Sequence, residues 1–440
     1  MMKSTKTLLQ NLAQGTRWFI PGLGIKRWVL LISLGSTLIG LGGVYLILWL
    51  YRLNWLPERL YNLVTLQFLP IQWRIILPLG IGVIAIFWGM TQIGISLTAP
   101  FRQKNETVLD ALYNHYQHSR GPHIVVIGGG TGLPTLLRGL REYTRNITAI
   151  VTVADDGGSS GRLRRELGVL PPGDFRNNIA ALSRDEALMT QLLQYRFGSS
   201  TLKNGQRELQ GHAFGNLLLA ALAGITGSFD EALLAAERVL AMRGRVLPAT
   251  LEQVTLVADV LVTDETGTAV SHHVIGESTI PKFGGKIQKV GLTPPNVRAY
   301  PPALQAIFQA DLIVMGPGSL YTSILPNLLV PDLAEALRHA RAPKVYVCNI
   351  ATQPGETDNY TVADHVAALL RHLPPGCLDI VLANDNLALP TQTGGGQTVY
   401  VQPTPPEGVK FITADLVDEA RPWRHDSQKL ARAIITLLSS

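Results

Sequence analysis

The sequence predicts a doubly wound, Rossmann-like α/β domain that carries a small antiparallel insertion and is preceded by two transmembrane helices. Three observations lead to this prediction. Short apolar runs, typical of buried parallel strands, alternate with segments of helical periodicity from about residue 123 onward. Glycine-rich polar turns follow several of these runs, as they do where a parallel sheet binds a ligand. Two uncharged stretches of 23 residues come earlier in the chain, and each is long enough to cross a bilayer.

Residues 1–100 are predicted to form a membrane anchor with spans at 28–50 and 75–97. Tryptophans lie at or near the span ends, as aromatic residues do at a bilayer interface. Five Lys and Arg residues precede the first span, so the positive-inside bias places the N-terminus in the cytoplasm. Two spans return the chain to the same side, and we expect the large domain in the cytoplasm at the plasma (inner) membrane. A cleaved signal peptide competes for the first span, but the apolar run is too long for one.

The distribution of charge argues against a nucleic-acid-binding protein. Residues 1–120 contain 11 Lys and Arg against 3 Asp and Glu, whereas the remaining 320 residues contain 27 against 29. The folded part therefore lacks the basic excess that binds nucleic acid. Cys348 and Cys377 are too few for a disulfide framework or a cysteine zinc site. His272 and His273 alternate between the faces of a predicted strand and cannot converge on one metal, so no metal site is expected.

The predicted elements follow one another in a regular order. Residues 101–122 are polar and form a linker, and the nucleotide-binding domain covers 123–440. The domain opens with a βαβ unit, in which Pro134 near the helix start supports the assignment. Four helices then lead to a hairpin, which is the antiparallel insertion, and strands and helices alternate again up to a final helix. The strands are predicted at 124–127, 147–153, 256–262, 269–275, 312–315, 344–348 and 378–382, the helices at 134–143, 174–182, 186–197, 213–225, 230–242, 303–309, 333–340, 362–373 and 428–438, and a loop at 391–397.

The first glycine turn is the most informative segment of the chain. Residues 125–132 read Val-Val-Ile-Gly-Gly-Gly-Thr-Gly, so a buried strand ends in four glycines within five residues. Glycine permits φ > 0, and without side chains the backbone N–H groups can face a phosphate at a helix N-terminus. The spacing matches neither a full dinucleotide fingerprint nor a P-loop. We expect a phosphorylated ligand, most simply a nucleotide, bound by Gly128, Gly129, Gly130, Thr131 and Gly132; a tight turn without a ligand is the alternative.

An aspartate pair follows the second strand. Asp155 and Asp156 lie at the carboxyl edge of the sheet, where ligands bind in such folds. They suit a ribose hydroxyl, an Mg²⁺ ion beside phosphate oxygens, or a general base. The alternative is that they only begin the Gly157-Gly158 turn. Ser159 and Ser160 then open a helix whose N–H groups are again available to an anion.

Two later segments extend the predicted site. Asp174, Arg176, Asn177 and Asn178 crowd one helical turn, which indicates a polar surface for base, sugar or phosphate; a helix N-cap is the alternative for Asp174 alone. His212 is interpreted as structural, while Asn216 in the same segment is added to the site. A second glycine turn after an apolar strand repeats the logic of the first and predicts another anion site, with Gly316, Gly318, Ser319, Tyr321 and Thr322.

Together these segments resemble the YvcK/CofD-like family over about residues 123–438. The resemblance rests on Gly-Gly-Gly-Thr-Gly, Thr-Val-Ala-Asp-Asp-Gly-Gly-Ser-Ser-Gly-Arg-Leu, Pro-Pro-Gly-Asp-Phe-Arg-Asn, Gly-Pro-Gly-Ser-Leu-Tyr-Thr-Ser and Cys-Asn-Ile-Ala-Thr-Gln-Pro-Gly-Glu-Thr. The residues after the aspartate pair resemble the YvcK branch, the gluconeogenesis factors. They differ from the other branch, the 2-phospho-L-lactate transferases. The chain departs from the family in its N-terminus, since family members are typically soluble.

The resemblance implies a CofD-like fold that binds a UDP-sugar such as UDP-N-acetylglucosamine. It further implies a role in cell shape and cell-wall synthesis during growth on gluconeogenic carbon sources. It adds Asn349, Gln353 and Arg424 to the site. Arg424 also fits on physical grounds, because it lies just before a helix that Asp426 or Ser427 can cap and its planar guanidinium can bind a diphosphate.

No nucleophile–base pair is readable in the sequence, so the first expectation is a non-catalytic binding and regulatory protein without a cofactor. The alternative is a 2-phospho-L-lactate transferase-like enzyme that uses a nucleotide-diphosphate donor and Mg²⁺. For the binding protein we expect the nucleotide ligand, the membrane and cell-wall synthesis or regulatory proteins as partners, and a homo-oligomeric state.

Overall fold

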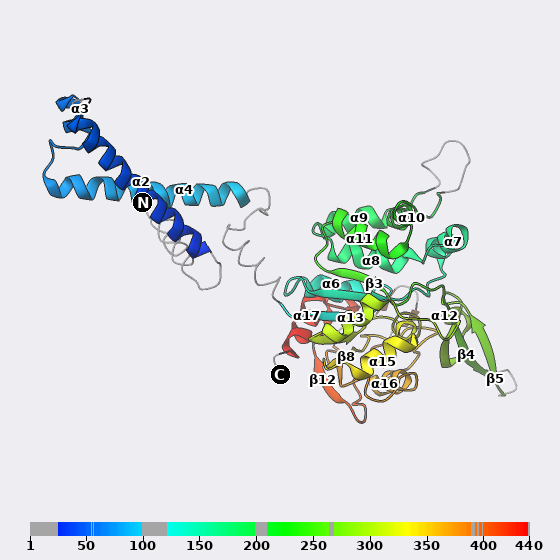
Figure 1. Cartoon of the computed structure of the whole chain (residues 1–440). Helices are drawn as coiled ribbons and strands as arrows, with labels where there is room; N and C mark the ends of the chain where they lie inside the picture. The colour runs from blue at the N-terminus through cyan, green and yellow to red at the C-terminus, as the bar shows by residue number, and fades with distance from the viewer. Residues whose placement is uncertain are drawn as a thin grey trace. The chain divides into compact units, whose positions relative to one another are not determined.

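The computed structural model describes residues 25–53, 55, 57–98, 121–198, 209–263, 268–388, 392–393, 396–397 and 399–438. The chain divides into two compact units, Met1–Tyr116 and Gln117–Ser440 (Figure 1). The predicted domain start near residue 123 is close to this division. Most of the predicted linker, residues 101–120, lies outside the described residues.

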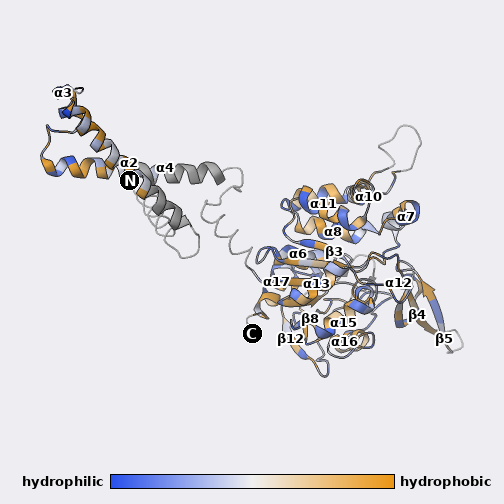
Figure 2. Ribbon diagram, viewed as in Figure 1, coloured by the Kyte–Doolittle hydropathy of each residue, from blue (hydrophilic) through white to orange (hydrophobic). Residues whose placement is uncertain are grey.

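The N-terminal unit contains two long helices, α2 (Ile25–Arg52) and α4 (Ile71–Thr98), and the short α3 (Glu58–Val64) between them. The described parts of α2 and α4 expose large apolar side chains to the surroundings of the unit (Figure 2). Leu34–Arg52 is long and apolar enough to cross a membrane, whereas the shorter Ile71–Ile84 is the apolar part found for α4 among the described residues. Among the described residues, one helix therefore combines the length and the apolar composition of a span, and the second span stays a prediction.

The C-terminal unit is built on a seven-stranded sheet in which every neighbouring pair is parallel. Every residue of β1, β7, β8 and β9 is buried, which requires cover on both faces of the sheet. Helices provide this cover, as α6 packs on α8 and α17, and α13 packs on α15. The predicted doubly wound α/β fold is confirmed. The strands are β1 (Ile124–Gly128), β2 (Ile147–Val151), β3 (Arg245–Pro248), β7 (Leu312–Met315), β8 (Lys344–Val347), β9 (Ile380–Asn384) and β12 (Lys410–Ala414).

The strand order β12-β9-β8-β7-β1-β2-β3 places the topological switch point between β1 and β7. From β1 the chain builds outward through β2 to β3, and from β7 it builds in the opposite direction to β12. In open α/β sheets the loops at such a point separate and leave a crevice at the carboxyl ends of the strands. The two glycine turns predicted as anion sites follow these two strands.

The antiparallel insertion has three strands instead of the two that the hairpin prediction gave. Strands β4 (Thr255–Thr263) and β5 (Ala269–Ile275) form the expected hairpin, and β6 (Lys286–Thr293) pairs with the other side of β4. The turn that connects the two strands of the predicted hairpin, residues 264–267, lies outside the described residues. The third strand follows the short helix α12 (Ile280–Phe283) and the Gly284-Gly285 pair, which separate it from the hairpin.

The remaining elements agree with the predicted order but differ in several details. Strands β3 and β12 were missed, and the predicted loop at 391–397 contains the small ladder β10–β11. A second small ladder pairs β13 with β14 just before the last helix. The other elements are α6 (Leu133–Leu140), α7 (Gly158–Leu167), α8 (Pro172–Leu182), α9 (Glu186–Gln194), α10 (Phe214–Thr226), α11 (Phe229–Val239), α13 (Pro301–Gln309), η4 (Leu320–Ile324), α14 (Leu325–Leu328), α15 (Pro331–His339), α16 (Val362–Leu370), β10 (Gln392–Thr393), β11 (Gly396–Gln397), β13 (Val417–Asp418), β14 (Arg421–His425) and α17 (Ser427–Thr436).

Candidate functional site

The two glycine turns pack directly on each other at the switch point. A Cβ atom on Gly132 would lie 2.6 Å from the Pro317 carbonyl oxygen, and one on Gly318 would lie 3.4 Å from the Gly129 carbonyl oxygen. Glycine is required at Gly132 by this contact and at Gly130 by its φ of +64°. Beside these two turns lies an opening that is bounded by the segment after β8 and by strand β14.

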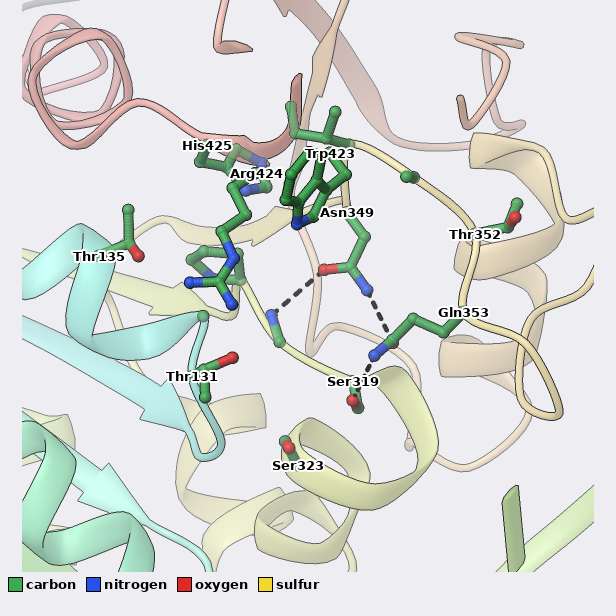
Figure 3. Close-up of a pocket in the computed structure, with 15 residues that line it drawn as sticks. Thr131, Thr135, Ser319, Ser323, Asn349, Thr352, Gln353, Trp423, Arg424 and His425 are labelled. Carbon is green, nitrogen blue, oxygen red and sulfur yellow. Dashed lines mark hydrogen bonds between the residues drawn. The ribbon is translucent and has the colours of Figure 1, made fainter. Parts of the chain in front are cut away.

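This opening is a cavity of about 250 Å³ at the carboxyl edge of the sheet (Figure 3). Its lining contains residues predicted from both glycine turns, from the segment after β8 and from the C-terminal segment. The lining residues are Thr131, Gly132, Thr135, Pro317, Gly318, Ser319, Ser323, Asn349, Ile350, Ala351, Thr352, Gln353, Trp423, Arg424 and His425.

A chain of hydrogen bonds organises one wall of the cavity (Figure 3). Asn349 accepts a hydrogen bond from the Gly318 N–H at 3.3 Å and donates through Nδ2 to Gln353 Oε1 at 3.1 Å. Gln353 in turn donates through Nε2 to Ser319 Oγ at 2.6 Å. These bonds fix the two side-chain amides that the sequence assigned to the site, and they tie the segment after β8 to the second glycine turn.

Strand β14 holds Arg424 over the opposite part of the cavity, where its guanidinium extends toward Thr131 (Figure 3). The next residue, His425, donates from Nε2 to the Cys348 carbonyl at 3.2 Å. Burial lowers the pKa of His425 to about 4, so the imidazole is neutral at pH 7 and suits this buried position. Asp426 then caps α17 by accepting from the N–H groups of Gln428 and Lys429 at 2.9 and 2.8 Å. The chain on the C-terminal side of Arg424 is therefore anchored.

Asp174 does not cap a helix, contrary to the alternative considered for it. Helix α8 begins at Pro172, and Asp174 Oδ2 instead accepts a hydrogen bond from the Gly130 N–H at 2.7 Å. This backbone N–H of the glycine turn is thus occupied by a carboxylate, where we had expected it to face a phosphate. Burial, with a further contribution from Asp155, raises the pKa of Asp174 to about 6.

Carboxylates gather beside the cavity on the same edge of the sheet. Asp155 accepts from the Gly157 N–H at 2.9 Å, which is the turn-forming bond considered as its alternative, whereas Asp156 accepts from the Ser278 N–H of the insertion at 2.9 Å. Burial first, and then the charges of Asp155, Asp174 and the neighbouring acids, raise the pKa of Glu277 to about 9. Glu356 accepts from Thr322 Oγ1 at 3.0 Å, and burial raises its pKa to about 7.

These carboxylates are not arranged as a preformed protein metal site among the described residues. In the parts of the chain that the structure describes, no group of three or more His, Cys, Asp and Glu side chains is arranged to hold a metal ion. Asp155 and Asp156 each have one oxygen engaged by a backbone N–H.

The other polar residues predicted on this edge bond mainly to one another. Buried Arg176 donates to Asn216 at 2.9 Å and to Asn177 at 3.0 Å, and Asn216 donates to Ser159 Oγ at 3.0 Å. The Ser159 hydroxyl also lies 3.0 Å from Nδ1 of buried His212, which fits the structural role given to that histidine. Other side chains of the predicted set are also placed outside the cavity lining: Asn178 donates to the Asp174 carbonyl, Ser160 is buried beside Gly173, and Tyr321 is fully buried with its hydroxyl 3.0 Å from that of Tyr360.

Replacing Glu277 with glutamine should change how the stability of the protein depends on pH. The folded-state pKa is about 9 and the unfolded value about 4.5, so folding takes up a proton between these values and stability rises as pH falls from 9 toward 7. We expect the wild type to gain on the order of 1–2 kcal/mol over this interval relative to Glu277→Gln. Thermal unfolding at pH 9, 8 and 7 measures the difference, with exposed Glu335→Gln as the control. Parallel pH profiles for all three proteins would contradict a protonated Glu277.

Several residues of the site were missed by sequence reasoning. Trp423 and His425 flank Arg424, and Ser323 lies one residue beyond the predicted part of the second glycine turn. Each of them therefore adjoins a residue that was predicted, and this proximity in the sequence could have identified it. Glu277 and Glu356 carried no such signal, because only the fold brings the insertion and the segment after β8 to the aspartate pair. Taken together, the fold and the site define an α/β protein with a candidate ligand cavity at the switch point of a parallel sheet.

Comparison with known proteins agrees with this class. Residues 124–434 match the family model described as 2-phospho-L-lactate transferase CofD. The Gluconeogenesis factor of Bacillus subtilis is 47% identical over 72% of this chain and 98% of its own, and a relative from Deinococcus radiodurans is 37% identical over 98% of this chain and 91% of its own. A crystal structure of a Bacillus halodurans protein is 45% identical, covers 72% of this chain and 99% of its own, and has a TM-score of 0.63. The chain belongs to the CofD family, and its relatives in that family include gluconeogenesis factors.

Proposed function

We propose that the C-terminal unit binds a UDP-sugar of the UDP-N-acetylglucosamine type in the cavity between the glycine turns. In this proposal the protein acts as a regulator, as the name of its Bacillus subtilis relative suggests, and it links the ligand to cell shape and cell-wall synthesis. The observation that carries the proposal is the position of Arg424, whose guanidinium shares the cavity with Thr131 and the start of α6. A planar cation and a helix N-terminus facing one space provide the charge pattern for a diphosphate.

The polar wall opposite Arg424 supports a nucleotide-sugar over a simple phosphate. Asn349, Gln353 and Ser319 place amide and hydroxyl groups along the cavity, and such groups hydrogen-bond to a base or a sugar. The transferase alternative draws its support from the description of the family model, and that description supports a transferase function for this chain only distantly. Gluconeogenesis-factor relatives favour the binding protein.

Substitutions of Arg424 test the proposal directly. Arg424→Lys keeps the charge but removes the planar fork, so affinity for UDP-N-acetylglucosamine should fall several-fold. Arg424→Ala should lower it at least about ten-fold, since a hydrogen bond to a charged group contributes about 1.5–3 kcal/mol. Isothermal titration calorimetry measures both variants and the wild type, and parallel titrations with GDP, with and without Mg²⁺, examine the transferase alternative.

Arg421 provides a matched control within the same strand. It is exposed, forms an ion pair with Asp418 at 3.1 Å and does not line the cavity, so Arg421→Ala should bind like the wild type. Equal affinities in the wild type and both Arg424 variants would place Arg424 outside the site. Tight GDP binding with turnover, and no binding of the UDP-sugar, would favour the transferase.

We also propose that α2 and α4 anchor the protein in the plasma membrane, with the large domain in the cytoplasm. The exposed apolar side chains of the described parts of both helices support this, because lipid would cover them. The alignment with the Deinococcus relative extends over 98% of this chain and therefore includes the helical N-terminal segment.

The membrane proposal predicts that the full chain stays with the membrane fraction after an alkaline carbonate wash. A chain beginning at residue 121 should be soluble and should still bind the ligand, since the C-terminal unit is compact on its own. Recovery of the full-length protein in the wash supernatant would contradict the anchor. Protease added outside spheroplasts should leave residues beyond 120 intact, and cleavage there would reverse the orientation.

A further inference from the structure

Trp423 lies on the wall of the cavity, and nothing in the proposed function assigns it a task. It is half-buried on β14, next to Arg424, and its indole lies beside Asn349, while the Arg424 guanidinium extends toward Thr131 (Figure 3). The cavity thus has a cationic end at Arg424 and the first glycine turn. The flat ring of Trp423, drawn beside Asn349, is a second surface of the same cavity (Figure 3).

We propose that Trp423 is the stacking surface for the pyrimidine base of the bound nucleotide. This inference rests on the proposed function, because it assumes a uridine nucleotide in this cavity. A base has a planar π face that stacks on an aromatic side chain, whereas a diphosphate needs the cationic end. Within one cavity, the Arg424 guanidinium suits the diphosphate of such a ligand and the Trp423 indole suits its base.

The polar groups beside the indole fit the edge of a uracil ring. The Nδ2 group of Asn349 and the Nε2 group of Gln353 each use one N–H within the wall, to Gln353 Oε1 and to Ser319 Oγ. An amide nitrogen carries two N–H groups, so each of these two has a second donor for the base. Uracil offers two carbonyl acceptors, whereas cytosine presents an amino group where uracil has one of them. A spare donor that meets the position of uracil O4 therefore favours uracil over cytosine, whose amino group would repel it.

The backbone that carries Trp423 is held in place before a ligand arrives. Val417 pairs with His425 and Asp418 with Arg421 in the β13–β14 ladder. The imidazole of His425 is hydrogen-bonded to the Cys348 carbonyl at the end of β8. A fixed aromatic surface loses little freedom when a base stacks on it, which favours binding.

The sequence provides a direct probe of this contact, because Trp423 is the single tryptophan in residues 121–440. This part folds as an independent unit: it is compact, and the related Bacillus halodurans protein, of which 99% aligns with 72% of this chain, crystallised as such a domain. In a chain comprising residues 121–440, the intrinsic tryptophan fluorescence comes from the cavity wall alone.

We expect UDP to change this fluorescence to the same extent as UDP-N-acetylglucosamine, and CDP to bind at least several-fold more weakly than UDP. In calorimetry, Trp423→Leu should lower the affinity for UDP at least ten-fold, whereas Trp423→Phe, which keeps an aromatic face, should stay within a few-fold of the wild type. Phe308→Leu, which removes an exposed ring on α13, is the control and should bind normally.

Contrary results distinguish a failure of the stacking role of Trp423 from a failure of the proposed UDP-sugar binding. If the wild type binds UDP-N-acetylglucosamine but Trp423→Leu binds UDP equally well, the stacking role is wrong while the proposed function stands. A fluorescence change with N-acetylglucosamine 1-phosphate and none with UDP would assign the indole to the sugar and overturn the inference. If no uridine nucleotide binds the wild type, both the proposed function and this inference are wrong.

Discussion

Gly132→Ala is expected to abolish detectable ligand binding and to lower the stability of the domain. The φ and ψ of Gly132 are −76° and −47°, which alanine adopts without strain, so the effect is steric. The new Cβ would lie 2.6 Å from the Pro317 carbonyl oxygen and 3.1 Å from Gly318 Cα, both backbone atoms of the facing turn. The two turns must separate to admit it, and overpacking of this kind costs about 1–3 kcal/mol.

Separation of the turns would also displace the Gly318 N–H from Asn349 and so disturb the wall of the cavity. Calorimetry with UDP-N-acetylglucosamine and thermal unfolding measure the two effects. Gly224→Ala is the control, because a Cβ there meets nothing within 4 Å in helix α10. Full binding by Gly132→Ala would show that the packing of the turns does not shape the site.

Arg176→Ala is expected to be the most destabilising single substitution on this edge of the sheet. Arg176 as a whole residue is 8% exposed, and its Nη1 donates to Asn216. Burial is the main cause that lowers its pKa, while the charges of Asp174 and Asp155 help to keep the group ionised. Removing the side chain would leave the buried Asn216 amide without this partner, and losing a hydrogen bond to a charged group costs about 1.5–3 kcal/mol.

The packing around Arg176 makes lysine a poor replacement as well. A Cβ on Gly215 would lie 2.6 Å from Arg176 Cγ, so α10 approaches the side chain closely. Lysine would keep the charge but could not reach Asn177 and Asn216 together. Denaturant unfolding should rank wild type above Arg176→Lys above Arg176→Ala. Exposed Arg238→Ala on α11 is the control and should lie within about 0.5 kcal/mol of the wild type. An unchanged midpoint in Arg176→Ala would show that this network does not support the fold.

Local sequence patterns were enough to predict the class of fold. Strands β1, β7, β8 and β9 are buried along their whole length, so each reads as a short apolar run between polar segments. The missed strands lack that signal. Strand β3 combines exposed Arg245 with Pro248, and β12 begins with exposed Lys410 and alternates partly exposed residues. Strands β3 and β12 are the two edges of the sheet, and an edge strand that helices cover less completely does not need to be uniformly apolar.

The sequence by itself also identified each glycine turn, because an apolar run followed by several glycines indicates a buried strand that ends in a tight turn. Tertiary structure alone decided what the turns do together. The pairing of β1 with β7 joins segments that are far apart in the chain, and it makes two separately predicted anion sites into the walls of one cavity. The tertiary structure also places Asp174 where it accepts a hydrogen bond from the Gly130 N–H, and it directs the Tyr321 side chain into the core. Residue type and strand position can be read locally, but the direction of a side chain and the neighbours it meets depend on strand order and packing over the whole domain.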